Sequence, residues 1–212
     1  MEELPDLEIE GGEWYRAVPP PAVPVPARHM PPELHGKPAL AVIDGLGALH
    51  DLRILGDAHQ DQTGRWVNVV PELDYWRTHI TPGTSAPARR VPLDQVWVEH
   101  RLPYEASAER PFTAAVPASD PNALLRRLAP GPGTPGGRTP LPARTVPHLH
   151  GRRIIQVNPL GFAWNLRAVS EPYDLDGEIT VNVVSAHDYY RWVITGKAPD
   201  PTPIALYLLW TE

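Results

Sequence analysis

The sequence predicts an all-β protein, or a β-rich protein with one or two short helices, built from two tandem copies of a small antiparallel barrel-like or sandwich-like domain. Two observations lead to this prediction. One block of sequence recurs within the chain. In addition, the apolar runs are rich in Val, Ile, Thr, Tyr and Trp, the residues that fit a pleated surface.

The repeated block is the strongest pattern in the chain. Residues 67–81 read VNVVPELDYWRTHIT and residues 181–195 read VNVVSAHDYYRWVIT, with nine of fifteen positions identical at an offset of 114. Three shorter blocks match in the same order: 46–55 with 160–169, 34–37 with 149–152, and 24–28 with 140–144. Four matched blocks in one order predict an internal duplication.

The duplication divides the chain into four parts. These are an acidic N-terminal arm (1–19), a first β repeat (20–103), a Pro/Gly-rich connector (104–137) and a second β repeat (138–212). Within the connector, Asp120 followed by Pro121 predicts a short helix near 121–128. The sequence PGPGTPGG at 130–137 is typical of a linker.

Each repeat contains five runs that predict strands. They are 39–44, 48–55, 65–70, 75–81 and 96–102 in the first copy, and 153–158, 162–169, 178–184, 189–195 and 204–211 in the second. Five short strands in each copy favour a small antiparallel barrel or sandwich, formed twice.

For two segments, 71–81 and 185–195, the sequence is compatible with either a hairpin or a short helix. Ser185 followed by Asp188 resembles a helix capping box, and Gly196 is a candidate helix C-cap. The β-branched and aromatic residues of both segments favour the hairpin instead.

The charge of the chain is concentrated at its start. The formal net charge is −6, and the first thirteen residues hold six acidic residues and no basic one. Without them, 19 acidic residues face 19 Lys plus Arg, so the body is formally neutral, which argues against a nucleic-acid partner. The alternation of Leu7, Glu8, Ile9 and Glu10 would also suit a strand added to a sheet edge.

Composition excludes several other classes of protein. The chain has no cysteine, which excludes a disulfide framework, thiol catalysis and iron–sulfur ligation. With 28 prolines the chain is proline-rich, yet 42% of its residues are apolar, too many for a disordered chain. We find neither a membrane-spanning run nor a signal peptide, so we expect a cytoplasmic or virion location and no membrane insertion.

A set of polar residues is shared by the two copies, and we expect most of it to serve the architecture of the repeat. The set consists of Arg28, His35, Arg53, Asp74 and Arg77, and of their counterparts Arg144, His150, Arg167, Asp188 and Arg191. Asp and Arg spaced three residues apart can pair with each other or satisfy a turn.

His148 and His150 are weak candidates for a metal site. On a strand, residues i and i+2 point to the same side and can share a metal ion. No third ligand stands at a diagnostic spacing, so we expect ordinary hydrogen-bonded histidines, no metal and no cofactor. No serine lies in a GxSxG setting, and no catalytic residue is assigned.

These observations favour a non-enzymatic structural or assembly protein. A chain with duplicated β domains can form a ring or lattice with itself and with other subunits, as the tail, connector or decoration proteins of a virion or phage-like particle do. The aromatic residues Trp14, Tyr15, Tyr104 and Phe112 lie outside the repeated blocks, and we expect them to be exposed anchors for such contacts.

The alternative is a carbohydrate- or small-ligand-binding module, or a hydrolase, with its site in the cleft between the repeats. Trp164 and Trp192 differ from their counterparts in the first copy, His50 and Thr78, and could form the platform of such a site. The oligomeric state distinguishes the two hypotheses, because a stable monomer would contradict the assembly protein.

Overall fold

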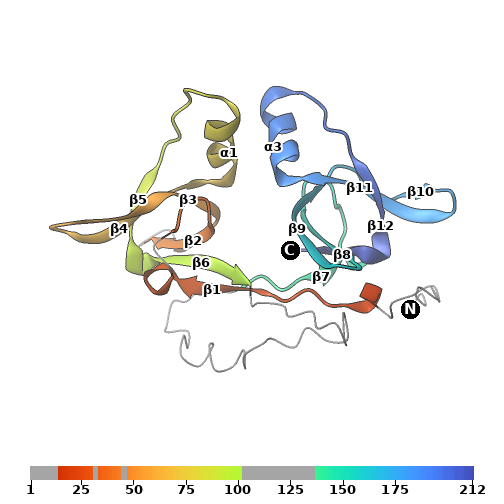
Figure 1. Ribbon diagram of the computed structural model, residues 1–212, viewed down its shortest axis with the longest axis horizontal. Helices are drawn as coiled ribbons and strands as arrows, with labels where there is room; N and C mark the ends of the chain where they lie inside the picture. Colours follow the sequence, from red (N-terminus) through yellow and green to blue (C-terminus); the bar gives the residue numbers. More distant parts are fainter. Residues whose placement is uncertain (1–13, 31–32, 44–46, 102–136) are drawn as a thin grey trace. The chain divides into compact units, whose positions relative to one another are not determined.

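The computed structural model describes residues 14–30, 33–43, 47–101 and 137–212 (Figure 1). The protein is β-rich, with two antiparallel sheets and, among the described residues, two α-helices, α1 (Glu72–Ile80) and α3 (Ala186–Thr195). The predicted connector helix at 121–128 and the acidic part of the arm lie outside the described residues.

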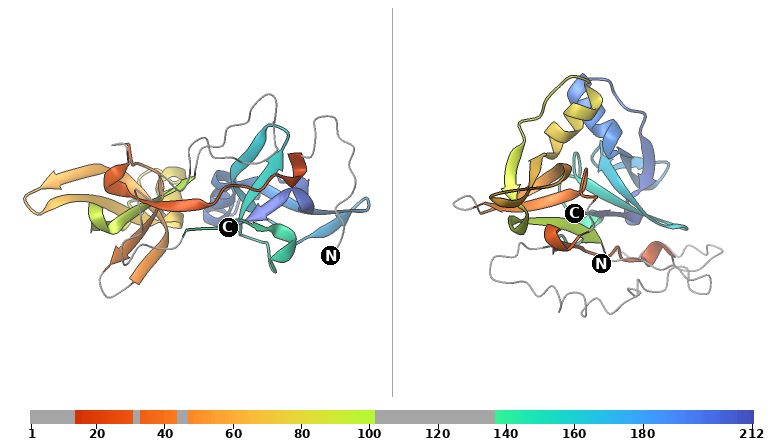
Figure 2. Two further views of the ribbon diagram at one scale, coloured as in Figure 1. Left: turned by 90° about the horizontal axis from the view of Figure 1, so that it is seen from below. Right: turned by 60° about the vertical axis from the view of Figure 1, so that its left-hand side comes forward.

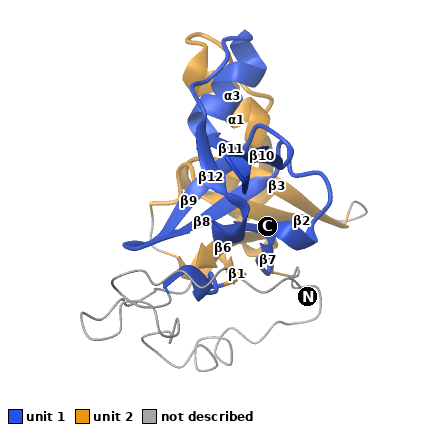
Figure 3. Ribbon diagram, turned by 90° about the vertical axis from the view of Figure 1, so that its right-hand side faces the viewer, with its two compact units in different colours: residues 1–20, 103–118, 139–212 blue, residues 21–102, 119–138 orange. Residues whose placement is uncertain are grey.

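The chain forms two compact units, coloured separately in Figure 3. In its described part, unit 2 contains residues 21–101 with 137–138, and unit 1 contains residues 139–212 with 14–20. Each unit is therefore completed by a short segment that is distant in sequence.

Unit 2 is a six-stranded antiparallel sheet with the order β1-β6-β2-β3-β4-β5. Its strands are β1 (Ala22–Pro26), β2 (Pro38–Ile43), β3 (Gly47–Asp61), β4 (Gly64–Pro71), β5 (Arg89–Pro92) and β6 (Val96–Arg101). The 3₁₀ turns η2 (Ala27–His29) and η3 (Leu93–Gln95) follow β1 and β5, and α1 connects β4 to β5. Strands β3 and β4 form a long hairpin (Figure 2).

Unit 1 has a seven-stranded sheet, in which the order of elements is that of unit 2 with one additional strand, β10, between β9 and β11. Its strands are β7 (Leu141–Pro142), β8 (Arg153–Asn158), β9 (Gly161–Ala168), β10 (Tyr173–Leu175), β11 (Glu178–Ser185), β12 (Thr202–Ala205) and β13 (Leu209–Thr211). The order is β10-β11-β9-β8-β13-β7, and β12 pairs with β11. Both β9 and β10 pair with β11, as the two ends of β3 pair with β4. The 3₁₀ turns are η1 (Trp14–Arg16), η4 (Ala143–Thr145) and η5 (Leu206–Leu208).

The sheets are not closed, so the barrel-like domain of the prediction is not confirmed. In unit 2, β1 and β5 stand at opposite ends of the strand order. One reason lies in the segments 75–81 and 189–195, which were expected to extend the sheets as strands. They are helical and leave the sheet instead.

The favoured hairpin interpretation of 71–81 and 185–195 is therefore wrong. The Ser185 hydroxyl accepts a hydrogen bond from the Asp188 backbone N–H at 3.0 Å, and Gly196 ends α3 in the left-handed conformation with φ 74°. In α3 these end signals and the burial of Tyr190 outweigh the strand preference of the residues. Helix α1 has no side-chain N-cap, so the burial of Tyr75 is the contribution that it shares with α3.

The run 204–211 also differs from its prediction as one strand. It is divided into β12 and β13 by the 3₁₀ turn η5. Strand β5 occupies the corresponding place in unit 2, and η3 separates it from β6.

Each unit has its own apolar core. In unit 2, Leu34, Ile54 and Val96 are among the fully buried side chains of the core. In unit 1, Leu149 and Leu209 are likewise fully buried in the core. Leu34 and Leu149 each begin a Leu-His-Gly turn, so this short motif anchors the turn in the core.

The two sheets share an irregularity that the sequence comparison did not single out. The β2–β3 register shifts between Ala39 and Ala41, and the β8–β9 register shifts between Ile154 and Gln156. The facing strands carry Asp51 and Asn165, 114 residues apart, in the left-handed region with φ 56° and 60°. Short polar side chains tolerate this conformation, whereas β-branched ones do not.

The backbone of Asn165 adopts the left-handed conformation. We therefore expect Asn165→Val to destabilise the protein by about 1–2 kcal/mol and Asn165→Gly to leave its stability nearly unchanged. Urea denaturation followed by circular dichroism measures both variants. Equal losses in the two variants would show that the side chain, not the backbone conformation, matters at this position.

Candidate functional site

Arg53 is the centre of the polar cluster in unit 2. Its Nη1 donates to the carbonyl oxygen of Gly36 at 2.9 Å. Its Nε and Nη2 donate to Oε1 of Glu72, the first residue of α1, at 3.0 and 2.5 Å. The side chains of Arg53 and Glu72 are only 11% and 4% exposed, so this ion pair is buried. Arg53 thus connects β3, the turn before β2, and α1.

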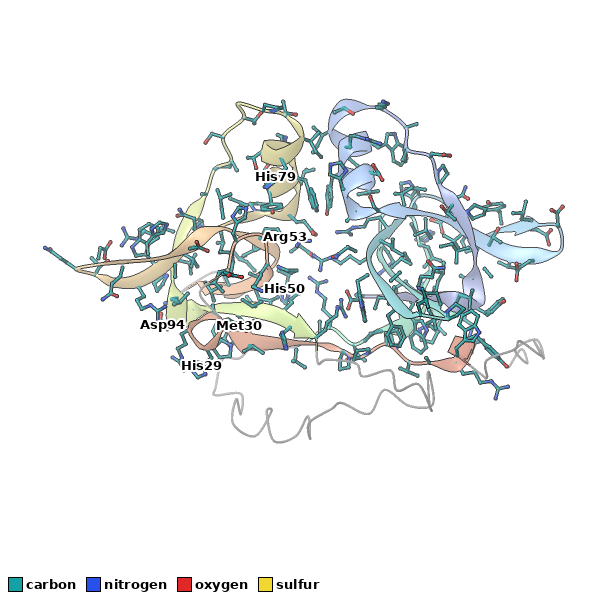
Figure 4. The ribbon with its side chains drawn as sticks, in the orientation of Figure 1. His29, Met30, His50, Arg53, His79 and Asp94 are labelled. Atoms are coloured by element: carbon teal, nitrogen blue, oxygen red, sulfur yellow. The ribbon has the colours of Figure 1, made fainter. Side chains whose placement is uncertain are left out.

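Aromatic and imidazole rings surround this arginine. The Arg53 guanidinium lies 5.9 Å from the ring centroids of both Tyr75 and Trp76. The ring centroids of Tyr75 and His79 are 4.2 Å apart. The positions of Arg53 and His79 are marked in Figure 4. His35 Nδ1 accepts a hydrogen bond from the Gly56 N–H at 2.8 Å.

Gly36 is required where the turn meets the helix. Its φ is 75°, and a Cβ at this position would lie 2.7 Å from the Tyr75 hydroxyl oxygen. Gly151 in unit 1 has φ 80°, with the Tyr189 hydroxyl 3.0 Å from the equivalent point. Both glycines allow a tyrosine of the helix to approach the backbone.

Arg167 makes the corresponding connections in unit 1. Its Nη1 donates to the Gly151 carbonyl oxygen at 3.1 Å, and its Nη2 donates to the Tyr190 hydroxyl at 2.8 Å. The position of Glu72 is taken by Ala186, and that of Trp76 by Tyr190. The arginine is therefore tied to the helix by a carboxylate in one unit and by a phenol in the other.

The remaining shared charged residues lie nearer the surface. Asp74 pairs with Arg77 on α1, and Asp188 pairs with Arg191 on α3 at 3.0 Å, each three residues apart. Arg28 and Arg144 are exposed in η2 and η4. These pairs stabilise a helix turn and bring together no common site.

The carboxylate of Asp188 belongs to the cap of α3. The Ser185 hydroxyl donates to Oδ2 of Asp188 at 2.8 Å, and this bond, helped by Arg191 and His187, lowers the pKa of Asp188. The carboxylate therefore stays ionised to a more acidic pH in the folded chain than in the unfolded one.

His148 and His150 do not lie on a strand, so the expected i and i+2 geometry is wrong. Both belong to the turn before β8, and His148 has φ 54°. His148 is 90% exposed, with Nδ1 4.0 Å from Glu171, while His150 lies beside Trp192, at 6.1 Å between ring centroids. Across the described ranges, no group of three or more His, Asp or Glu side chains is arranged to hold a metal ion.

Trp14 and Tyr15, expected to be exposed, are instead buried at 7% and 6% exposure. They pack in unit 1 with Val157 of β8 and with Tyr207 and Trp210. The two aromatic residues therefore anchor the described segment 14–17 in unit 1. Tyr104 and Phe112 lie outside the described residues.

The two tryptophans of the proposed ligand platform are both half-buried and belong to separate ring contacts. Trp164 on β9 lies 5.5 Å from Phe162. Trp192 on α3 contacts His150 and Tyr189.

A further cluster at the tip of the β3–β4 hairpin was not expected from the sequence. Asp61 accepts hydrogen bonds from the Thr63 hydroxyl and N–H, from Trp66 Nε1 and from Arg90, and these bonds hold its pKa well below its usual range. Arg90 lies 4.2 Å from the Trp66 ring centroid, and His59 stacks on the same ring at 4.5 Å. The Trp66 ring is thus already engaged within the hairpin.

Sequence reasoning also missed Glu72, Trp76 and Tyr190, because comparing the two similar segments 67–81 and 181–195 selects only the residues that they share. The sequence does contain a signal, which is a difference at two paired positions. One segment has Glu72 and Trp76 where the other has Ala186 and Tyr190. Two positions four residues apart on one helix face that change together indicate a common partner.

This paired difference gives a testable exchange. We expect Glu72→Ala to destabilise the chain by roughly 3 kcal/mol, because it leaves the Arg53 guanidinium buried without its carboxylate. In Glu72→Ala/Trp76→Tyr the new hydroxyl can accept from Arg53 as Tyr190 does from Arg167.

The loss in this double variant should therefore be smaller than the sum of the two single losses by about 1 kcal/mol or more. Urea denaturation of the four proteins measures the coupling. Strict additivity would contradict the equivalence of the two arginine contacts.

The lowered pKa of Asp188 predicts a pH dependence. Its contribution to stability is complete above the unfolded pKa of about 3.9 and is lost as pH falls toward the lower folded value. Ser185→Ala should lower the free energy of unfolding by about 1 kcal/mol at pH 7. Between pH 5 and pH 3, the free energy of unfolding of this variant should fall by less than that of the unaltered chain. Denaturation curves at both pH values test this, and parallel losses would contradict it.

Neither of the two described helices is long and apolar enough to cross a bilayer. No known protein family, curated protein or solved structure matches this chain, so its function must be inferred from the arrangement of its own residues.

Proposed function

We propose that this protein is a non-enzymatic assembly protein whose two β units arose by internal duplication and which forms a ring or lattice with further copies of itself. A tail, connector or decoration component of a virion or phage-like particle is the form of assembly that we favour. The alternative, a ligand-binding module, is addressed by the same experiment.

Matched backbone contacts support the duplication. Gly36 N–H donates to the Ile54 carbonyl and Gly151 N–H to the Ala168 carbonyl, each at 2.8 Å. Apart from the additional strand β10 of unit 1, the strand order recurs in the two units. The bulge before each arginine also recurs, as does the helix that follows β4 in unit 2 and β11 in unit 1. Shared irregularities of this kind argue for common descent more strongly than shared regular strands do.

The observation that carries the assembly proposal is the way in which each unit is completed. Trp14 and Tyr15 are buried in unit 1, although the chain continues from them into β1 of unit 2. Arg138, which directly precedes the strands of unit 1, pairs with Ala22 of β1 in unit 2 and binds Glu99 and Asp51 at 2.6 and 2.8 Å.

Segments docked in this manner can be exchanged between identical chains at low energetic cost. Domain swapping uses the same contacts within one chain and between two chains, so it produces oligomers without a new interface. The exposed apolar side chains Leu141, at 52%, and Val18, at 55%, lie on or beside the docked segments and favour further contacts.

Light scattering coupled to size exclusion tests the proposal. We expect a mass that is a multiple of 23.4 kDa and that increases with protein concentration. Leu141→Lys on the end strand β7 should lower the mass, because charge on a sheet edge opposes pairing. Leu160→Lys, at a turn residue that is 95% exposed, is the control.

A monomer at every concentration would contradict the assembly function. That result would favour a ligand-binding module instead.

A further inference from the structure

A groove of about 250 Å³ lies on unit 1, where η1, η4, η5 and β13 meet. Its apolar lining includes Tyr15, Leu206, Tyr207 and Trp210, and its charged lining consists of Arg16 and Arg144. Both arginines are exposed, and none of the described residues that line the groove is acidic. The groove therefore suits an extended segment that carries both apolar and acidic side chains.

Tyr207 adds a hydrogen-bond donor to this surface. Burial, together with the nearby Glu178 and Tyr15, raises the pKa of Tyr207, so its phenol keeps its proton at neutral pH. A protonated phenol beside two arginines can bind a carboxylate.

The chain itself contains a segment of the required chemistry. Residues 1–13, outside the described part, carry six acidic residues and no basic one, with Leu4, Leu7 and Ile9 between them. They end directly before Trp14, so they are joined to the groove through Tyr15 and Arg16, two of its lining residues.

The connection also permits the chain to turn back onto the groove. Gly11 and Gly12 separate the acidic residues 2–10 from Trp14, and glycine pairs favour tight reversals. Ten extended residues reach up to about 35 Å, far more than the groove requires. A tether this short gives an effective concentration on the order of millimolar, which favours binding within the same molecule.

We propose that residues 1–10 dock in this groove of the same molecule, with acidic side chains at Arg16 and Arg144 and apolar side chains on Tyr207 and Trp210. The docked segment covers a surface that would otherwise be open to acidic partners. This inference does not depend on the assembly function, because it requires no second copy.

The absence of cysteine from the chain allows a direct test by disulfide trapping. The test pair is Leu7→Cys with Thr145→Cys, next to Arg144 in η4. The matched control is Leu7→Cys with His29→Cys, because His29 is the exposed counterpart of Thr145 in unit 2 at the offset of 116. Under mild oxidation of dilute protein, we expect an intramolecular disulfide to form at least tenfold faster in the test pair.

Charge reversal and salt test the role of the arginines. In the test pair, Arg144→Glu should lower the rate to that of the control pair, whereas Arg28→Glu, at the counterpart position, should leave it unchanged. In 1 M NaCl the rate of the test pair with both arginines intact should also fall severalfold, because salt screens exposed charges. The salt measurement does not depend on how a variant folds.

Equal rates in the two pairs, or a rate insensitive to Arg144→Glu and to salt, would overturn the proposal. Disulfides formed only between molecules would overturn it as well, because they would place the segment on a second copy. That last outcome would leave the assembly function standing, whereas a monomeric protein with rapid trapping would remove the assembly function and support the docked segment.

Discussion

One arginine in each unit makes the contact on which the helix and the turn both depend. Arg53 and Arg167 donate to the carbonyl of the glycine that ends a Leu-His-Gly turn, and each reaches a helix with its remaining donors. The helices have only nine and ten residues, lengths at which isolated helices are marginal in water. Their stability must therefore come from tertiary contacts, and the arginine is the polar part of those contacts.

Arginine suits this role because its planar fork can serve several acceptors at once. The glycine carbonyl and the helix partner accept from different nitrogens of the guanidinium, and the centroids of the aromatic rings of the helix lie 5.3–5.9 Å from it. Gly36 and Gly151 complete the arrangement, since a side chain at either position would meet a tyrosine hydroxyl. Turn, strand and helix are thus fixed together by a small number of groups.

The arginines of the two units, Arg53 and Arg167, bind partners of different chemistry. Unit 2 uses the buried carboxylate of Glu72, and unit 1 uses the phenol of Tyr190. Both arginines are committed to internal partners, so the functional surface is better sought where side chains remain exposed. The groove beside Arg16 and Arg144 and the open end of the sheet at β7 are such places.

The sequence by itself determined the β-rich class, the acidic arm and most strand positions, because alternating and β-branched runs report local burial directly. It could not decide between hairpin and helix at 71–81 and 185–195, since that choice depended on the burial of Tyr75 and Tyr190 and, for 185–195 alone, on the caps at Ser185 and Gly196. Nor could it place Trp14 and Tyr15 in unit 1, or find the partners of the two arginines. Those features join residues that are far apart in the chain, and only the tertiary structure brings them together.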